Sequence, residues 1–122
     1  MTEPEKKKRV LVVDDHPKVL KFIEIGLKLQ GFEVFCASSG VQALELVGTA
    51  RPDIMLLDMF MPDKDGFAVL QELRITSTMP VIAFSASPEN QDPAFRAGAN
   101  DFVHKPFNPE DITRKINALL RF

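Results

Sequence analysis

The stretch RVLVVDDHPKV, residues 9–19, decides the fold prediction because it joins a strand, a charged turn and a helix start. Four apolar residues typical of a buried strand, Val10 to Val13, run directly into Asp14 and Asp15. Pro17 then suits the first position of a helix. Two adjacent carboxylates repel each other and lose hydration when buried, so they indicate either turn chemistry or a binding site.

Four further apolar runs predict strands at residues 33–37, 54–57, 81–84 and 102–103. Their apolarity is continuous rather than alternating, which is typical of parallel strands that helices cover on both faces. Helical patterns lie between the runs, so a strand followed by a helix recurs along the chain. Right-handed crossovers then give an open, doubly wound α/β sheet, which binds ligands beyond the carboxyl ends of its strands.

Apolar spacing and capping residues predict the helices. The first is expected from Pro17 to Gln30, the second after a Ser39 cap, the third from about Gly66, and the last after an Asn108 cap. These assignments complete an alternating strand and helix order over the whole domain.

The helix between the fourth and fifth strands is the weakest, because prolines at positions 88 and 93 interrupt it. We expect Asp92 as its cap, Pro93 in its first position and Gly98 at its end, with residues 87–91 as a loop. The sequence therefore predicts a short or irregular fourth helix.

Length and composition limit the function classes. The 122 residues fit one domain, and the formal net charge of −2 gives no general affinity for nucleic acid. The basic run at 6–9 follows two glutamates, so we expect residues 1–8 to form a flexible, solvated tail ahead of a domain spanning 9–122. The chain has neither a secretory signal nor an apolar run of membrane-spanning length, which predicts a cytoplasmic protein without a membrane partner.

Polar side chains follow four of the five predicted strands: Asp14 with Asp15, Asp58, Ser85 and Lys105. Each alone has an ordinary explanation as a helix cap, a turn residue or a surface group. Together, the carboxylates would raise one another's pKa unless a cation lay among them. Oxygen ligands without a cysteine or histidine partner favour Mg²⁺, since the single Cys36 offers no cysteine cluster. An ammonium and a hydroxyl would add contacts to a phosphoryl group.

These motifs make the chain resemble a response-regulator receiver domain of two-component signalling. The matching stretches are VLVVDD at 10–15, PDIMLLDMFMPDKDGF at 52–67, PVIAFSA at 80–86 and GANDFVHKPF at 98–107. The resemblance extends from about Arg9 to Leu120 and implies a flavodoxin-like fold with strand order 2-1-3-4-5.

The resemblance also implies a role for each site residue. Asp58 is the expected phosphoacceptor. Asp14 and Asp15 are the acidic pair that positions Mg²⁺, Asp15 more directly and Asp14 mostly through water, and the backbone carbonyl of Phe60 is a further ligand. Lys105 is expected to contact the phosphoryl oxygens.

A second group of positions is expected to act in switching and hydrolysis. Ser85 is the switch hydroxyl and Phe102 the aromatic whose rotamer reports the switch. They stand where the family often has threonine and tyrosine, substitutions that the switch should survive. Phe60 and Ser87 are expected to line the path of the water that attacks the phosphoryl group, and a phenyl ring there predicts a long-lived phosphoryl state.

Three further positions fit the resemblance, and two histidines are given no role. Lys105 and Pro106 correspond to a cis peptide of the family, Ala86 leaves room for the phosphoryl group, and Pro62 and Gly66 fit the loop after the acceptor. His16 and His104 are interpreted as surface or packing residues.

The resulting interpretation is a phosphorylation-dependent switch, not an enzyme beyond its own phosphoryl uptake and slow autodephosphorylation. Its expected partners are a histidine kinase or histidine phosphotransfer protein and a downstream protein that the sequence does not identify. The chain is expected to be either a stand-alone receiver or a piece of a longer protein.

Two alternatives belong to other function classes. Mg²⁺-dependent aspartyl-phosphate phosphatases of the haloacid dehalogenase type carry D-x-D after the first strand, whereas this chain has D-x-D only at 63–65, in a loop. A non-phosphorylated interaction module or a flavin binder could use the same fold. The intact acidic site disfavours the module, and the chain lacks an evident platform for a flavin ring.

Overall fold

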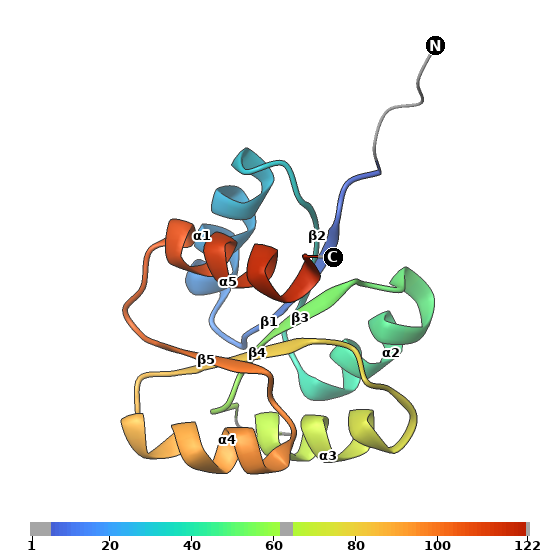
Figure 1. Cartoon of the computed structure of the whole chain (residues 1–122), viewed down its shortest axis with the longest axis vertical. Coiled ribbons are helices and arrows are strands. Elements are labelled where there is room, and N and C mark those ends of the chain that lie inside the picture. Colours follow the sequence, from blue (N-terminus) through green and yellow to red (C-terminus); the bar gives the residue numbers. More distant parts are fainter. Residues whose placement is uncertain (1–5, 62–64, 122) are drawn as a thin grey trace.

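The computed structural model describes residues 6–61 and 65–121 of the chain. In this part of the chain one parallel sheet has the order β2-β1-β3-β4-β5, as predicted (Figure 1). Its strands are β1 (Arg9–Val13), β2 (Glu33–Ala37), β3 (Ile54–Asp58), β4 (Val81–Ser85) and β5 (Asp101–His104). All neighbouring strands in this order pair in parallel, which confirms the flavodoxin-like α/β fold.

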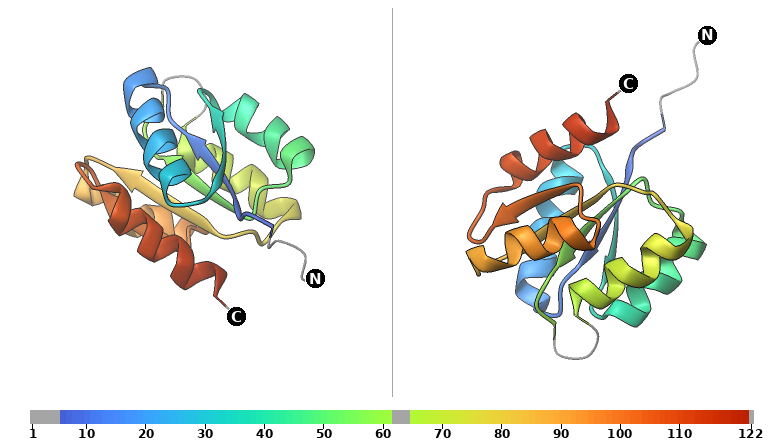
Figure 2. Two further views of the ribbon diagram at one scale, coloured as in Figure 1. Left: turned by 90° about the horizontal axis from the view of Figure 1, so that it is seen from above. Right: turned by 60° about the horizontal axis from the view of Figure 1, so that its bottom comes forward.

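Helices cover both faces of the sheet (Figures 1 and 2). They are α1 (Pro17–Leu29), α2 (Gly40–Ala50), α3 (Gly66–Thr76), α4 (Gln91–Ala97) and α5 (Pro109–Leu120). One core cluster joins the sheet to α1 and α5, and the other joins it to α2, α3 and α4. The molecule therefore has three layers, with the sheet in the middle.

Successive residues of a strand point to opposite layers, which explains the continuous apolar runs. On β1, Val10 and Val12 pack in the cluster with α1 and α5, whereas Leu11 and Val13 pack in the other cluster. Every residue of β3 and β4 is buried. A polar residue at the end of either strand therefore enters a dry environment.

The predicted caps of two helices are confirmed. The Ser39 hydroxyl accepts a hydrogen bond from the Gln42 N–H at 3.2 Å, and the Asn108 side chain accepts one from the Asp111 N–H at 3.0 Å. At the start of α1 the cap residue is His16, whose side chain makes no capping hydrogen bond. The ordinary explanation of Asp14 or Asp15 as this cap is therefore wrong.

The fourth helix is short and irregular as predicted, but its expected start is wrong. A 3₁₀ turn, η1 (Pro88–Asn90), runs directly into α4, so Pro88 and not Pro93 takes the first helical position. Asp92 lies inside the helix rather than capping it. Pro93 is tolerated because it falls within the first turn of α4, where backbone N–H groups have no intrahelical acceptor and the loss of one costs no helical hydrogen bond. The end of the helix is as expected, with Gly98 at a φ of +113°.

The ends of the chain add little to the fold. Residues 6–8 are exposed and lie outside helices and strands, while residues 1–5 lie outside the described part of the chain, so the flexible tail stays a prediction. Within the described residues, no helix combines the length and apolarity needed to cross a membrane.

A glycine at the start of α3 lets this helix approach the end of β3. A Cβ on Gly66 would lie 2.7 Å from both the Asp58 carbonyl oxygen and the Met59 Cα. Both are backbone atoms, which cannot move aside as a flexible side chain could. Gly66 thus allows the backbone after Asp58 to take its position.

We expect Gly66→Ala to lower the free energy of unfolding by about 1–3 kcal/mol, because the added methyl overpacks against backbone. Gly48→Ala is the matched control: Gly48 lies within α2 with nothing within 4 Å of its added Cβ, so alanine should stabilise the protein by up to about 1 kcal/mol. Urea unfolding of both variants measures the difference. Equal stabilisation by the two alanines would contradict the close-approach argument.

Candidate functional site

The carboxyl edge of the sheet gathers the polar residues that the core buries. Asp14, Asp58 and Ser85 are the buried polar or charged residues of the described chain, at 0%, 2% and 3% exposure. They follow or end β1, β3 and β4, which lie side by side in the sheet. Burial of polar groups is costly, and its concentration at one edge indicates a site rather than scattered packing.

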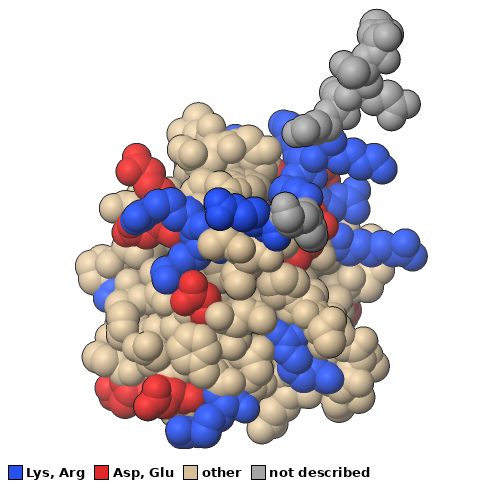
Figure 3. Space-filling model, viewed as in Figure 1, with Lys and Arg blue, Asp and Glu red and all other residues tan. Residues whose placement is uncertain are grey.

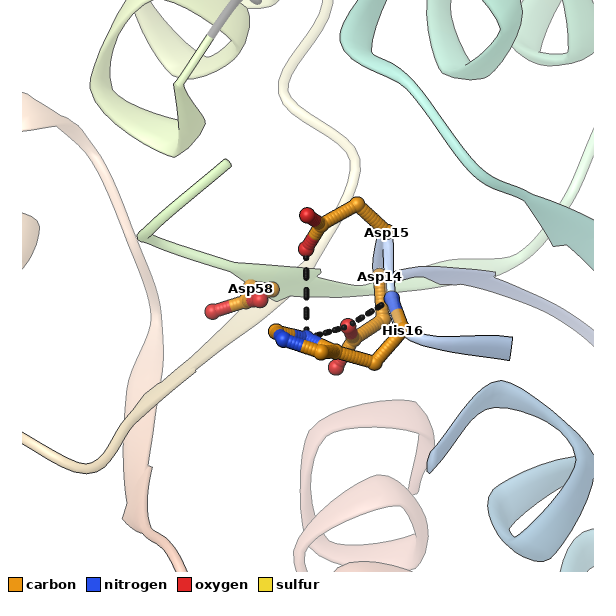
Figure 4. Close-up of side chains that lie close together, drawn as sticks. All are labelled: Asp14, Asp15, His16 and Asp58. Carbon is orange, nitrogen blue, oxygen red and sulfur yellow. Dashed lines mark hydrogen bonds and ion pairs between the residues drawn. The ribbon is translucent and has the colours of Figure 1, made fainter. Parts of the chain in front are cut away.

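Four metal-ligating side chains converge there: Asp14, Asp15, His16 and Asp58 each offer an atom within 4.8 Å of the others. Figure 4 shows Asp14, Asp15 and His16 reaching from the end of β1 and Asp58 from the end of β3. The His16 Nδ1 lies 3.1 Å from Asp14 Oδ1 and 3.3 Å from Asp15 Oδ1. The structure thus brings together the three predicted carboxylates and adds a histidine.

Lys105 supplies the opposite charge from the loop after β5. Its ammonium Nζ donates a hydrogen bond to Asp14 Oδ2 at 3.2 Å and lies 3.6 Å from Asp58 Oδ2. Its backbone N–H donates to the carbonyl oxygen of Ser85 at 2.9 Å, which fixes the start of the loop against β4. The peptide bond to Pro106 is cis, as the resemblance implies.

The Asp58 carboxyl is only partly compensated by its neighbours. Its pKa is raised from the ordinary 3.8 to about 6, mainly by burial and in smaller part by the charges of Asp14 and Asp15. The Phe60 N–H, which donates to Asp58 Oδ1 at 3.1 Å, and the Lys105 charge act in the opposite direction.

Two carboxylate oxygens of the cluster make no hydrogen bond. Asp58 Oδ2 and Asp15 Oδ1 are buried and make no hydrogen bond. The Lys105 ammonium lies 3.6 Å from the Asp58 oxygen, and the His16 Nδ1 lies 3.3 Å from the Asp15 oxygen. Unpaired buried carboxylate oxygens are costly unless a cation compensates them. The donor set of three carboxylates fits a hard divalent cation such as Mg²⁺.

The hydroxyl of Ser85 is engaged in the short turn that follows β4. Its Oγ accepts hydrogen bonds from the Ser87 N–H at 3.0 Å and from the Asn90 side-chain amide at 2.9 Å. Asn90 belongs to η1, so this amide links the end of β4 to the start of the fourth helix. Sequence reasoning did not find Asn90, because residues 87–91 were expected to be a loop.

A cavity of about 240 Å³ opens at this edge, and the residues that line it lie at or after the carboxyl ends of strands. They are His16, Asp58, Phe60, Ser85, Ala86, Ser87 and Lys105. The Phe60 side chain is 77% exposed, so it borders the cavity rather than filling the core. Pro62 lies outside the described residues, and Gly66 begins α3.

Phe102 and His104 lie beside each other on β5. Phe102 is buried at 6% exposure, and its ring packs edge-on against the His104 ring with centroids 5.0 Å apart. His104 is exposed, and its Nε2 lies 3.2 Å from the Gln91 Oε1. The interpretation of His104 as a surface residue agrees with this placement. His16 differs, because it contacts the acidic cluster.

The sequence model described as the response regulator receiver domain matches residues 10–117 of this chain. The chain belongs to this family. It is 40% identical over 119 residues to the probable transcriptional regulator ycf27 of Guillardia theta, covering 96% of this chain and 47% of the relative. The ycf27 protein of Cyanophora paradoxa is 38% identical over 117 residues, at 94% and 49% coverage. The chain thus spans about half the length of these curated relatives.

Solved structures agree with this assignment. The chemotaxis protein CheY4 of Vibrio cholerae has a TM-score of 0.87 and 30% identity, covering 94% of this chain and 100% of that chain. The receiver domain of the Francisella response regulator 1452 has a TM-score of 0.86 and 34% identity, covering 93% and 96%. A putative response regulator from Chloroflexus aurantiacus has a TM-score of 0.89 and 30% identity, covering 96% and 100%.

Family membership gives the chain a function in two-component signalling, where receiver domains are regulatory switches that interact with histidine kinases and downstream targets. Receiver domains bind Mg²⁺ at an acidic pocket of this kind. The phosphatase and the non-phosphorylated module find no support in the comparisons. Because two relatives are named transcriptional regulators, the absence of a nucleic-acid partner stays a prediction.

Positive side chains gather at another part of the molecule, beside the amino-terminal segment (Figure 3). The residues that line a depression there are Lys6, Lys7, Lys8, Arg9, Arg51, Glu33 and Asp53. Glu33 and Asp53 offset part of this charge, since Arg9 pairs with Glu33 at 3.5 Å and its N–H donates to Asp53. This surface lies at the amino end of β1, opposite the acidic site.

We expect Asp58→Asn to raise the free energy of unfolding by about 2 kcal/mol at pH 8 without divalent cation, because it removes an incompletely compensated buried charge. The folded pKa of about 6 exceeds the ordinary value of 3.8, so protonation stabilises the native protein below about pH 4, and that stability is lost as the pH rises through 6. The gain from Asn should therefore shrink as the pH falls.

Thermal and urea unfolding in a chelating buffer between pH 5 and 8 measures this effect. Asp92→Asn, at an exposed position on α4, is the control and should change stability little at any pH. A wild-type protein that is at least as stable as Asp58→Asn at pH 8 would show that the Asp58 charge is fully compensated.

Proposed function

We propose that Asp58 receives the phosphoryl group through which this receiver domain switches. The observation that carries the proposal is the Asp58 Oδ2 atom, buried and without a hydrogen bond, beside the Lys105 ammonium and the Asp14 and Asp15 carboxylates. It is the one aspartate at the end of the central strand, with the cavity open in front of it.

The carboxylates of Asp14, Asp15 and Asp58 and the backbone carbonyl of Phe60 would hold Mg²⁺. When bound, this cation supplies positive charge to the carboxylates and to the phosphoryl oxygens. The two buried oxygens without a hydrogen bond and the oxygen-rich donor set support this assignment.

In the proposed transfer, an Asp58 carboxylate oxygen attacks the phosphorus of a phosphohistidine on a histidine kinase or histidine phosphotransfer protein. The new O–P bond forms while the P–N bond breaks, and its electron pair stays on the leaving imidazole nitrogen, which takes a proton from solvent. Lys105 places a positive charge between Asp14 and Asp58, where negative charge accumulates.

Switching would begin when the Ser85 hydroxyl turns to donate to the phosphoryl group. Its oxygen now accepts from the Asn90 amide, so a side-chain rotation that carries this oxygen toward Asp58 would break the contact that joins β4 to η1. Phe102 belongs to the same core cluster as Ala94 of α4, which supports a coupling between the expected reporter aromatic and the helix that would respond. The proposed output is therefore a change around η1 and α4, read by a downstream protein.

The remaining sequence predictions complete the proposal. The domain spans 9–122 after a tail at 1–8, works in the cytoplasm, and turns over no external substrate beyond its own phosphoryl uptake and slow loss. The net charge of −2 supports the absence of a nucleic-acid partner for this domain.

Intact-protein mass spectrometry after incubation with acetyl phosphate and Mg²⁺ tests the acceptor. We expect one phosphoryl adduct that requires the cation and is absent in Asp58→Asn, because an amide oxygen is a poor nucleophile. Asp92→Asn should retain the adduct at full yield. An undiminished adduct in Asp58→Asn would assign the phosphoryl group to another residue.

Phe60 and Ser87 are proposed to tune hydrolysis of the phosphoryl group. Both line the cavity, and the exposed Phe60 ring can cover the approach of water without orienting it. We expect Phe60→Asn to shorten the lifetime of the phosphorylated protein severalfold, because an amide can position the attacking water.

The decay is followed after donor removal by the same mass measurement. Leu29→Asn, at a 79% exposed position at the end of α1, is the control for replacing an exposed apolar side chain and should decay like the wild type. Equal or slower decay in Phe60→Asn would rule out shielding by the ring.

A further inference from the structure

The His16 side chain lies on the acidic cluster instead of capping α1. It occupies the N-cap position, where a serine or aspartate side chain would accept a backbone hydrogen bond, yet it makes none. Its Nδ1 lies 3.1 Å from Asp14 Oδ1 and 3.3 Å from Asp15 Oδ1 (Figure 4). We propose that His16 is a nitrogen ligand of the cation site and makes this site prefer a first-row transition cation over Mg²⁺.

The backbone holds His16 in this place. The His16 N–H donates to Asp14 Oδ1 at 2.8 Å, and Pro17 fixes the first position of the helix that follows. The side chain remains 60% exposed, so the contact with the carboxylates is not imposed by core packing. The turn between β1 and α1 therefore presents the imidazole to the cluster.

The donor atoms are spaced as neighbouring ligands of one cation. Two ligands each about 2.1 Å from an octahedral ion lie about 3.0 Å apart when they are adjacent. The separations from Nδ1 to the Asp14 and Asp15 oxygens, 3.1 and 3.3 Å, are close to this value. Without a cation they are hydrogen-bond and ion-pair contacts, which a bound ion would replace while the three atoms stay near their places.

The buried oxygens without a hydrogen bond also point to a ligand here; one is the Asp15 oxygen already named, and the other belongs to Asp58. Asp15 Oδ1 and Asp58 Oδ2 are buried without a hydrogen bond, and the Asp58 side chain is 98% buried, since only 2% of it is exposed. The cluster thus offers one imidazole nitrogen with three carboxylates, all within 4.8 Å.

The nitrogen donor changes which cation this set favours. Mg²⁺ prefers oxygen ligands and keeps several waters, whereas imidazole suits Fe, Ni, Cu and Zn ions, which also bind nitrogen and oxygen sites more tightly along the Irving–Williams series. A His16 ligand would therefore specify which class of cation the proposed site prefers. The inference rests on the proposed function, because it requires that this site bind a divalent cation.

Isothermal titration of the full chain at pH 7.5 with Zn²⁺ and, separately, Mg²⁺ tests the proposal. We expect His16→Ala to weaken Zn²⁺ binding by about tenfold or more while Mg²⁺ binding changes much less. The chain has two histidines, so His104→Ala is a matched control; His104 contacts Gln91 and Phe102 rather than the carboxylates, and its loss should change neither affinity.

The ¹⁵N spectrum of the two imidazoles locates the ligand directly. Saturation with Zn²⁺ should move the Nδ1 resonance of His16, because this nitrogen would bind the metal, and should leave the His104 resonances unmoved. Saturation with Mg²⁺ should move neither. Asp15→Asn with Asp58→Asn should abolish both the high-affinity heat and the His16 shift, which places the ion in the cluster.

Each remaining outcome is decisive. Parallel changes in Zn²⁺ and Mg²⁺ affinity in His16→Ala, or an unmoved His16 Nδ1 resonance at Zn²⁺ saturation, would overturn the nitrogen ligand while leaving the proposed Mg²⁺ site intact. Failure of the wild type to bind either cation would instead overturn the proposed cation site itself, and the inference with it.

Discussion

The burial of like charges at one edge of the sheet is the constraint on which the rest of this structure depends. Asp14 and Asp58 are almost fully buried, and one ammonium, from Lys105, stands between them. Two carboxylate oxygens of the cluster remain without a hydrogen bond. Such an arrangement is costly to the fold, and the proposed binding of a cation and a phosphoryl group at this edge would compensate it.

The fold holds these charges together through its layers. Because helices cover both faces, β3 is buried along its whole length and carries Asp58 to the buried end of the strand, beside the cavity. The parallel order puts the ends of β1, β3 and β4 side by side. Close packing at Gly66 and the hydrogen bond from the Phe60 N–H then set the backbone just after Asp58. The same packing that stabilises the domain therefore also sets the geometry of the site.

The sequence predicted the strands and the polar residues at their ends, because continuous apolar runs and cap residues are local signals. The strand order was implied by the resemblance to receiver domains. It missed what depends on three-dimensional neighbours. His16 was interpreted as a surface residue, since nothing in DDHP tells that the ring turns back onto both carboxylates. Asn90 was assigned to a loop because Pro93 looked like a helix start, whereas Pro88 begins the 3₁₀ turn and brings the Asn90 amide to Ser85. In both cases a side chain contact made after folding decided the outcome.

The Asn90 contact also links the two ends of the proposed switch. A hydroxyl has one proton to donate, and in this state the Ser85 oxygen accepts from both the Ser87 N–H and the Asn90 amide. Both bonds leave the proton free for a new acceptor on Asp58, and the amide would lose its partner when the Ser85 side chain rotates to carry its oxygen toward that acceptor. Since η1 runs directly into α4, which has seven residues and one fully buried side chain, little packing opposes a local rearrangement there. In the proposed switch, a charge added at the buried end of β3 would therefore be read at the surface through two hydrogen bonds and a short helix.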